Sequence, residues 1–391
     1  MSTPRIAIVI SHPIQHFCPQ YASLAGLGIA HIKVFFASAL GYKKYFDPGF
    51  GRQVRWGNLY LDKFDHEFLN DEAAPRPDKN IDAGNLEAKL NEYSPDIVIL
   101  YGYYQKLQRR AHRWASRTGV KMAYISDSEK RHKRNGIWET IKYPFIYRYF
   151  SRIDFFLTVG DANEDFYKSY GVSRKKMISM HFPIDKRLYE KAFREKQLLN
   201  AAIRAKYDIP ENEAVFSVVG KLVDWKSQQD IINAIKLLES DGKRYHLFLI
   251  GSGPMEQTWK ELSASLANSK VYFAGFIDPT DLPSYYAASD IYIHPARVEP
   301  HSLSISEAIY MGCPVILSDT CGSYGKSDDV QPCRNGFVYS YGDVRELADK
   351  INILINDPAL RNSFGKKSHE LAMEYQHRSH EGILYDLIQT K

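Results

Sequence analysis

The sequence lacks any long apolar stretch. Its longest apolar candidates, such as PDIVIL and YHLFLIG, have the length of a strand and fall well short of the ~18 uninterrupted apolar residues of a membrane-spanning helix. The chain is therefore not expected to be integral to a membrane. Its first residues pass from MSTPR directly into IAIVI without the apolar region and cleavage site of a signal peptide, so secretion is not expected either.

Cysteines and paired acids are scarce as well. The four cysteines, Cys18, Cys313, Cys321 and Cys333, include no C-x-x-C pair, which argues against a structural zinc site and a disulfide framework and fits a reducing cytoplasm. The sequence contains no D-x-D motif, and the single DSE at 127–129 is not enough to predict a metal-binding pair. We therefore expect no metal and no other cofactor.

The composition that is present is typical of a soluble globular protein, with 44% apolar and 25% charged residues. A chain of 391 residues is too long for a single ordinary core, and ~150 residues per domain predicts two or three domains. The net charge of +5 is unevenly distributed, because residues 101–152 contain thirteen basic and three acidic side chains. Such a segment attracts phosphates, lipid headgroups or nucleic acid, and a solvated basic face is the alternative.

Strand-like and helix-like segments alternate twice along the chain. The strand-like runs are rich in β-branched and aromatic residues and show little polar alternation, which indicates strands buried on both faces. They are residues 5–10, 31–37, 96–102, 121–126 and 154–160 in the first half, and 214–220, 245–251, 270–275, 290–295 and 314–318 in the second. Strands alternating with helices predict an α/β protein of two doubly wound, Rossmann-like domains with parallel sheets.

The predicted boundary lies near residues 186–210, at the charged helix RLYEKAFREKQLLNAAIRAKYDI that ends at Pro210. We expect a first domain at 1–198, a second domain at 199–371, and a last helix at about 372–391. Ligands of open α/β sheets bind at the carboxyl ends of the strands, so two facing domains predict a cleft between them.

Three strand-to-helix turns of the second half carry polar or glycine-rich motifs. VGKLVDWK places Lys221 and Lys226 beside a helix start, which favours a phosphate site, although two solvated lysines would look the same. IGSGP places Gly251 and Gly253 at the next turn, and a lone G-x-G is a weak signal.

The third turn, RVEPHSLSISEA, carries two carboxylates eight residues apart. Glu299 lies in the loop, and Glu307 lies in a helix that is expected to begin near Ser302. The free N–H groups of Ser302, Leu303 and Ser304 would then face the cleft beside Glu307. Either acid alone could be an exposed or capping residue, but three such turns on one sheet edge favour a common binding site.

The order VGKLVDWK, LIGSGP, VYFAGF, IYIHPARVEPHSLSISEAIYMGCPVI, SDTCG and NGFVY resembles the nucleotide-sugar domain of the retaining glycosyltransferases of family 4. The resemblance runs from about Tyr207 to Phe364 and continues more weakly through RIDFFLTVGDANEDFYKSYGV and HFPID. It implies the GT-B fold of bacterial polysaccharide and glycolipid glycosyltransferases, with a last helix that crosses back to the first domain.

The resemblance also implies roles for these residues. The lysines at 221 and 226 would hold the donor diphosphate, together with the helix start at 302–304, and Glu299 would lie beside the donor sugar as a catalytic residue. Glu307 would bind the ribose hydroxyls. The backbone around Gly275 and Phe276 would lie beside the base.

The sequence departs from the family pattern at several positions. Lys221 stands where arginine is usual, and EPHSL replaces a loop that often carries Phe or Gly. SHPIQHF replaces a glycine-rich turn in the first domain, so three of its polar residues are expected to face the cleft or the acceptor, with capping of the following helix as the alternative. A tyrosine after the strand-like run at 96–102 is expected in the cleft as well. A carboxylate stands where a catalytic histidine is common, and a general-base or sugar-positioning role is implied for it. The expected cleft residues are His12, Gln15, His16 and Tyr103, and the substituted carboxylate is Asp127.

The implied function is that of a hexosyltransferase. It would move a sugar from a nucleotide-diphosphate sugar to a hydroxyl of a glycan, glycolipid or small-molecule acceptor without a bound metal. UDP is favoured over GDP as the nucleotide of the donor. Another GT-B enzyme, such as a nucleotide-sugar epimerase, and a non-catalytic sugar-nucleotide-binding subunit are the alternatives. Specific nucleic-acid binding is not expected, because acids line the second-domain cleft. We expect a cytoplasmic protein that is peripheral at the inner face of the membrane if the basic segment 101–152 docks there.

Overall fold

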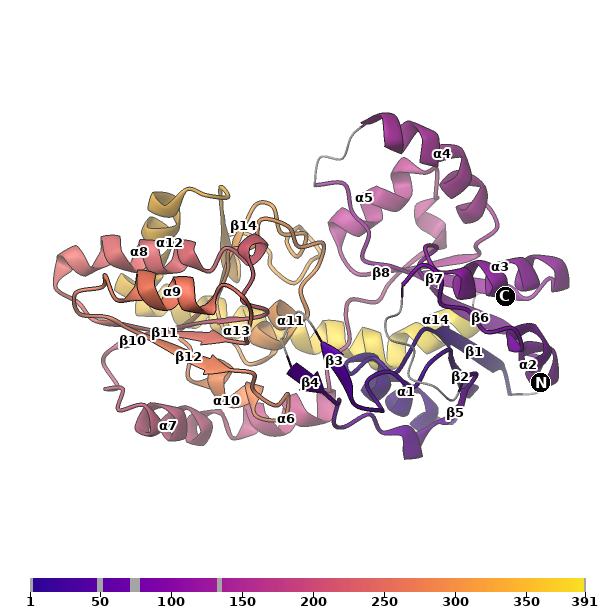
Figure 1. Ribbon diagram of the computed structural model, residues 1–391, viewed down its shortest axis with the longest axis horizontal. Helices are drawn as coiled ribbons and strands as arrows, with labels where there is room; N and C mark the ends of the chain where they lie inside the picture. Colours follow the sequence, from indigo (N-terminus) through magenta and orange to yellow (C-terminus); the bar gives the residue numbers. More distant parts are fainter. Residues whose placement is uncertain (1–2, 48–51, 71–77, 132–135, 390–391) are drawn as a thin grey trace.

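The computed structural model describes residues 3–47, 52–70, 78–131 and 136–389. Two parallel sheets, each covered by helices on both faces, form two domains that lie side by side (Figure 1). This confirms the predicted α/β class with two doubly wound domains. Within the described residues, no helix combines the length and the apolar character needed to cross a membrane.

The first domain contains a seven-stranded parallel sheet of order β5-β2-β1-β6-β7-β8-β9. Its strands are β1 (Arg5–Ile10), β2 (His31–Phe36), β5 (Asp65–Phe68), β6 (Ile97–Tyr101), β7 (Lys121–Ile125), β8 (Phe155–Thr158) and β9 (Met177–Ser179). Its helices are α1 (Phe17–Gly26), α2 (Leu86–Tyr93), α3 (Lys106–Thr118), α4 (Gly136–Phe150) and α5 (Asp161–Ser169). Alternate residues of β1 enter two separate apolar cores, one on each face of the sheet, which is why the strand shows no polar alternation.

The second domain contains a six-stranded parallel sheet of order β12-β11-β10-β13-β14-β15. Its strands are β10 (Ala214–Val219), β11 (Tyr245–Ile250), β12 (Lys270–Gly275), β13 (Ile291–His294), β14 (Val315–Ser318) and β15 (Gly336–Tyr339). Its helices are α8 (Gln229–Leu238), α9 (Glu256–Ser263), α10 (Leu282–Ala287), α11 (Leu303–Tyr310) and α12 (Val344–Asn356). In the described part of the chain, short turns of 3-10 helix lie at Leu61–Lys63 and Arg174–Lys176 in the first domain, and at Asp224–Lys226 and Glu239–Asp241 in the second.

The change from the first core to the second lies earlier than the predicted boundary at residue 198. The helices α6 (Lys186–Arg194) and α7 (Lys196–Lys206) follow the last strand of the first sheet. Tyr189 and Ile203, one from each helix, are buried in the second-domain core against α10 and α11. The charged helix was expected to lie across the domain boundary, but the apolar faces of α6 and α7 belong to the second domain.

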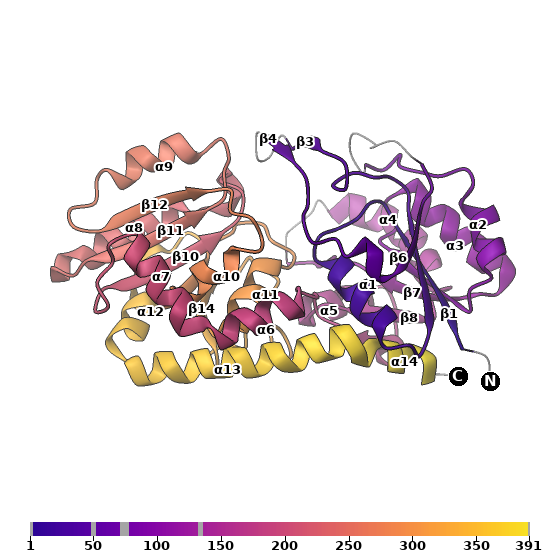
Figure 2. The same cartoon turned by 90° about the horizontal axis from the view of Figure 1, so that it is seen from below.

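The C-terminal helices connect the two domains. The long helix α13 (Pro358–His377) begins in the second domain and runs beneath both domains in Figure 2. After one π-helical turn at Arg378–Gly382, α14 (Ile383–Gln389) places its apolar side chains in the first-domain core. The C-terminal helix therefore crosses back to the first domain, as predicted. The helical segment begins earlier than the predicted residue 372, because it is continuous with α13, and residues 390–391 lie outside the described part.

Two further contacts join the domains around the cleft. The hairpin of β3 (Tyr45–Asp47) and β4 (Arg52–Val54) extends from the first domain toward the second (Figure 2). On another side, Arg131 donates hydrogen bonds of 2.7 Å to the backbone carbonyls of Cys321 and Tyr324. The cleft is therefore closed on more than one side by direct contacts.

Candidate active site

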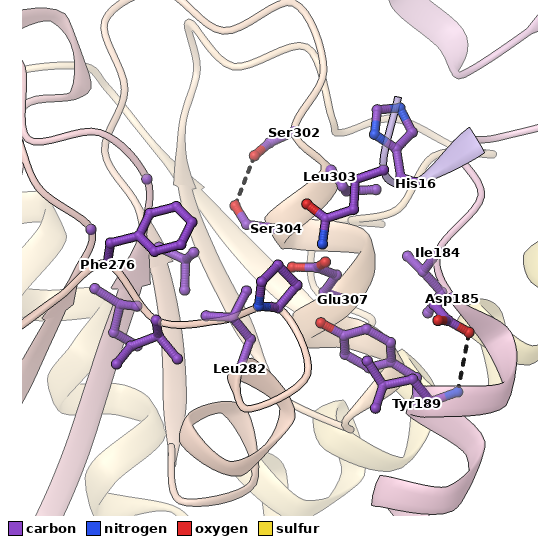
Figure 3. A pocket seen from close by; sticks show the side chains of 18 of the residues that line it. His16, Ile184, Asp185, Tyr189, Phe276, Leu282, Ser302, Leu303, Ser304 and Glu307 are labelled. Atoms are coloured by element: carbon purple, nitrogen blue, oxygen red, sulfur yellow. Dashed lines mark hydrogen bonds between the residues drawn. The ribbon is translucent and has the colours of Figure 1, made fainter. Parts of the chain in front are cut away.

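A pocket of about 390 Å³ lies between the two domains, at the carboxyl ends of the second-domain strands. Both domains contribute to its wall, as the predicted cleft requires. Figure 3 shows Glu307 in the middle of this pocket, with Phe276 on one side and Asp185 and Tyr189 on the other. A pocket of this size suits a small organic ligand.

The turn after β11 explains how backbone reaches this pocket closely. A Cβ atom on Gly251 would lie 2.0 Å from the carbonyl oxygen of Gly220, and one on Gly253 would lie 2.2 Å from that of Leu222. Only glycine allows the ends of β10 and β11 to approach in this way. The G-x-G motif therefore has a packing function here, and Gly220 and Gly251 also line the pocket.

The start of α11 presents backbone N–H groups to the pocket. Ser302 precedes the helix in an extended conformation, and Ser302, Leu303 and Ser304 all line the pocket. The Ser302 N–H is occupied by the Ser323 hydroxyl at 2.9 Å, whereas the helix start at 303–304 is directed toward the cavity wall. This end of the helix carries a partial positive charge that favours a bound anion.

Glu307 is one turn further along α11 and lines the same pocket. The Tyr286 hydroxyl donates a 2.8 Å hydrogen bond to its carboxylate. Burial raises the pKa of Glu307 to about 7, and the hydrogen bond from Tyr286 only partly offsets this effect. The carboxylate is therefore held where it can accept hydrogen bonds from ligand hydroxyl groups.

Glu299 and Lys226 form an ion pair within the pocket wall. The Glu299 carboxylate also lies 3.2 Å from Nε2 of His294, a buried residue at the end of β13. Burial alone would raise the pKa of Glu299, but the hydrogen bond with His294 and the charge of Lys226 lower it to about 2. Glu299 is therefore ionised at neutral pH. Glu299, predicted to contact the sugar, and Lys226, predicted to contact the diphosphate, thus contact each other.

Lys221 lies outside the set of residues that line the pocket. Its ammonium group is 3.1 Å from Asp47 of the β3–β4 hairpin, and its side chain is 36% exposed. The predicted phosphate pair is thus divided, with Lys226 in the wall and Lys221 bound to the hairpin at the rim.

The predicted base-binding and first-domain residues are partly in place. Phe276 lines the pocket, and the carbonyl of Gly275 accepts a 2.8 Å hydrogen bond from the Gly251 N–H just behind it. Gln15 and His16, which follow β1, line the opposite wall. His12 is directed elsewhere, because its Nδ1 lies 2.9 Å from the Ser11 hydroxyl and it is not among the lining residues.

Asp127 and Tyr103 are outside the pocket, contrary to the prediction that they serve it. Tyr103 packs against Tyr149 and Phe150, because the segment after β6 turns toward the first-domain core. Asp127 is exposed between the domains, close enough to His301 and Glu299 to be affected by their charges. It is therefore near the pocket without contributing to its wall.

His301 is a buried histidine that sequence reasoning only marked as a departure from the family loop. It lines the pocket and lies 3.3 Å from Asp328 and 3.7 Å from Asp329. Burial alone would lower the pKa of His301, but Asp328 and Asp329 raise it to about 9. The side chain is therefore a buried cation next to the Glu299 loop.

Several lining residues were missed because no local motif marks them. Trp56 and Asn58 follow the β3–β4 hairpin, and Asp185 and Tyr189 lie at the start of α6. Asp185 caps α6 by accepting the Leu188 N–H at 3.3 Å (Figure 3). The HFPID motif was the only sequence signal for this group.

Residues 200–371 match the family model described as "Glycosyl transferases group 1". That range is essentially the second domain. An uncharacterized glycosyltransferase of Haemophilus influenzae is 28% identical over 166 residues, which cover 42% of this chain and 46% of that protein. The capsular polysaccharide biosynthesis glycosyltransferase CapM of Staphylococcus aureus is 28% identical over 174 residues, covering 44% of this chain and 45% of CapM. The aligned stretch thus spans less than half of the length of these relatives.

The chain is similar in structure to Anabaena HepE, whose crystal structure was solved in complex with UDP. The alignment covers 98% of this chain and 99% of HepE, with a TM-score of 0.71 and 16% sequence identity. The fold is GT-B. Two Rossmann-like domains of the GT-B type therefore enclose the pocket, and most of its second-domain wall is formed by the stretch that matches group 1 glycosyl transferases. Within the described residues, no group of three His, Cys, Asp or Glu side chains is placed to hold a metal ion in this GT-B protein.

Proposed function

We propose that this GT-B protein is a glycosyltransferase that uses a nucleotide-diphosphate sugar, with UDP preferred to GDP. The observation that carries this proposal is the pocket itself, in which Glu307, the start of α11 and the Lys226–Glu299 pair face one cavity. The match of residues 200–371 to group 1 glycosyl transferases and the UDP bound by HepE support the donor class.

The groups in the pocket suit the parts of such a donor. Glu307 would accept hydrogen bonds from the ribose hydroxyls, next to Phe276 beside the base. The diphosphate would lie against the start of α11 and the ammonium of Lys226. Negative charge that develops on the leaving diphosphate would then be stabilised by a lysine and by backbone N–H groups without a metal.

Glu299 would act on the sugar. When the diphosphate binds Lys226, the ion pair with Glu299 is shared with the ligand, and the carboxylate remains ionised because its pKa is about 2. Such an anion would orient the sugar hydroxyls and stabilise positive charge on the ring in the transition state. We propose retention of the anomeric configuration on the basis of the family 4 resemblance, and product stereochemistry by NMR tests it.

The acceptor would approach from the first-domain side. Gln15 and His16 line this wall, and burial lowers the pKa of His16 to about 4, so its imidazole is neutral. Neutral polar groups suit a hydroxyl of a glycan, a glycolipid or a small molecule. We further propose a cytoplasmic location at an anionic membrane surface, supported by the excess of basic residues in 101–152.

Binding and turnover can be tested separately. Calorimetry with UDP-, GDP- and ADP-sugars should give the tightest binding for a UDP-sugar, and Lys226→Gln should weaken it, whereas the exposed Lys243→Gln should have no effect. Release of free sugar from the bound donor without acceptor then distinguishes a transferase from a non-catalytic binding subunit. If none of the three nucleotide sugars binds, the donor assignment is refuted.

A further inference from the structure

A second cavity, of about 410 Å³, lies in the first domain between α3 and α4. Five arginines form much of its lining, and we name it the arginine groove. These residues are Arg109, Arg113 and Arg117 from α3, with Arg148 and Arg152 from α4 and the loop that follows it. Both ribbon views place α3 and α4 in the first domain, away from the second-domain sheet (Figures 1 and 2).

Most of this positive charge has no acidic partner among the described residues. On the same helix, Arg110 binds Asp82 through two hydrogen bonds of 2.8 and 2.6 Å, and Arg117 pairs with Glu87. No described acidic side chain pairs with Arg113, Arg148 or Arg152, which converge on one cavity from different elements. Like charges gathered in this way repel each other, and a bound anion would relieve that repulsion.

Buried polar groups without a partner line the same cavity. The Tyr149 side chain is 6% exposed, and its hydroxyl has no hydrogen-bond partner among the described residues. The buried hydroxyl oxygen of Ser116 also has none there, and both residues line the groove. Unpaired buried hydroxyls are costly, so their presence in the wall of a charged cavity indicates a site for a hydrogen-bonding ligand.

The histidine of the groove does not add to its charge. Nε2 of His112 contacts the backbone carbonyl of Tyr149 at 3.1 Å, and its ring stacks on the Tyr149 ring. Burial lowers the pKa of His112, and the charges of Arg152 and Arg113 lower it further. The positive charge of the groove is therefore carried by guanidinium groups, whose planar donors match phosphate oxygens in pairs.

We propose that the arginine groove is a binding site for the phosphate group of an anionic ligand, separate from the interdomain pocket. A lipid headgroup and a soluble phosphorylated compound share this chemistry. The exposed Phe145 of α4 lines the groove, and the exposed Ile141 lies one turn earlier on the same face of that helix; these apolar side chains favour the lipid as the source. The inference does not depend on transferase activity, because it concerns a different cavity.

The test uses the full chain and two kinds of probe. Calorimetry measures binding of glycerol 3-phosphate, and co-sedimentation measures binding to vesicles of phosphatidylcholine alone or mixed equally with phosphatidylglycerol. The double variant Arg148→Gln/Arg152→Gln should weaken binding of glycerol 3-phosphate and of the mixed, anionic vesicles about tenfold or more. The matched control Lys243→Gln/Arg345→Gln removes the same charge from exposed second-domain residues and should bind as the unmodified protein does.

Tyr149→Phe provides a variant that keeps all charges and the ring packing. It should weaken binding about two- to fivefold if the hydroxyl contacts the ligand. If glycerol 3-phosphate and the mixed vesicles both bind, and the double variant loses both, the result supports a site for phosphate from either source. If only the mixed vesicles bind, the result supports a lipid headgroup. If neither glycerol 3-phosphate nor the mixed vesicles bind, or if the double variant binds as the control does, the proposal is overturned.

Discussion

The raised pKa of Glu307 predicts that donor binding depends on pH between 6 and 8. The carboxylate must be ionised to accept hydrogen bonds from both ribose hydroxyls, and its pKa in the free protein is about 7. At pH 6, about one molecule in ten is ionised, so a UDP-sugar should bind about tenfold more weakly than at pH 8, equivalent to about 1.4 kcal/mol.

The variant Glu307→Gln should abolish this dependence. It should bind the UDP-sugar more weakly than the unmodified protein at pH 8, by ~1.5 to 3 kcal/mol, because a charge-assisted acceptor is lost. Its affinity should then be almost the same at pH 6 and pH 8. Calorimetry with the UDP-sugar is preferred to UDP, because the diphosphate diester gains no proton in this range. Burial raises the pKa of Asp329 to about 6, and comparison of the two proteins separates its titration from that of Glu307.

Stability gives an independent measure of the same group. Since the folded pKa of Glu307 lies above its unfolded value, the protonated side chain favours the folded state at low pH, and this contribution is lost as the pH rises through about 7. Glu307→Gln should therefore gain stability relative to the unmodified protein between pH 5 and pH 8, measured by thermal unfolding. Equal pH dependence of binding in both proteins, or binding that is flat from pH 6 to 8 in the unmodified protein, would refute the reasoning.

The ion pairs around the pocket and its metal-free chemistry can also be tested. Asp47→Asn removes the charge that pairs with Lys221 and should strengthen UDP-sugar binding about two- to fivefold, whereas weaker binding would mean that the contact helps to form the site. Glu299→Gln should lower kcat about 100-fold without weakening UDP binding, because it removes the carboxylate that competes with the diphosphate for Lys226, and an equal loss of both would assign Glu299 a structural role. Turnover should survive EDTA, and an absolute requirement for added Mg²⁺ or Mn²⁺ would contradict a diphosphate site built on Lys226.

The central strands could be predicted closely from the sequence, because they are buried on both faces. The run at 5–10 is β1, and the runs at 121–126 and 245–251 each match a strand within one residue at their ends. The edge strand β12 of the second sheet was also predicted, at 270–275, whereas the edge strands of the first sheet were not. β5 and β9 are short and only partly buried, so their sequences lack the continuous apolar run that identifies a central strand.

The second-domain wall of the pocket was also predictable, because local motifs encode it. In a parallel sheet, the carboxyl ends of the strands lie at one edge. The turn after one of these strands carries Glu299, Glu307 and the start of α11, so all three could be placed at that edge. The first-domain wall depends on how the two domains pack, which no local pattern encodes. Tyr103 was therefore placed in the cleft although it packs in the core, and Trp56 was missed although it lines the pocket.

The crossing of the C-terminal helices determines the order in which the chain can fold during synthesis. Ile383, Leu384 and Leu387 complete the apolar core on one face of the first sheet, and Ser379 donates a hydrogen bond to the backbone carbonyl of Met180, which follows β9. A nascent first domain leaves the ribosome well before these residues and carries an open apolar surface until they arrive. The second domain can close its core earlier, so the half that is made first is completed last.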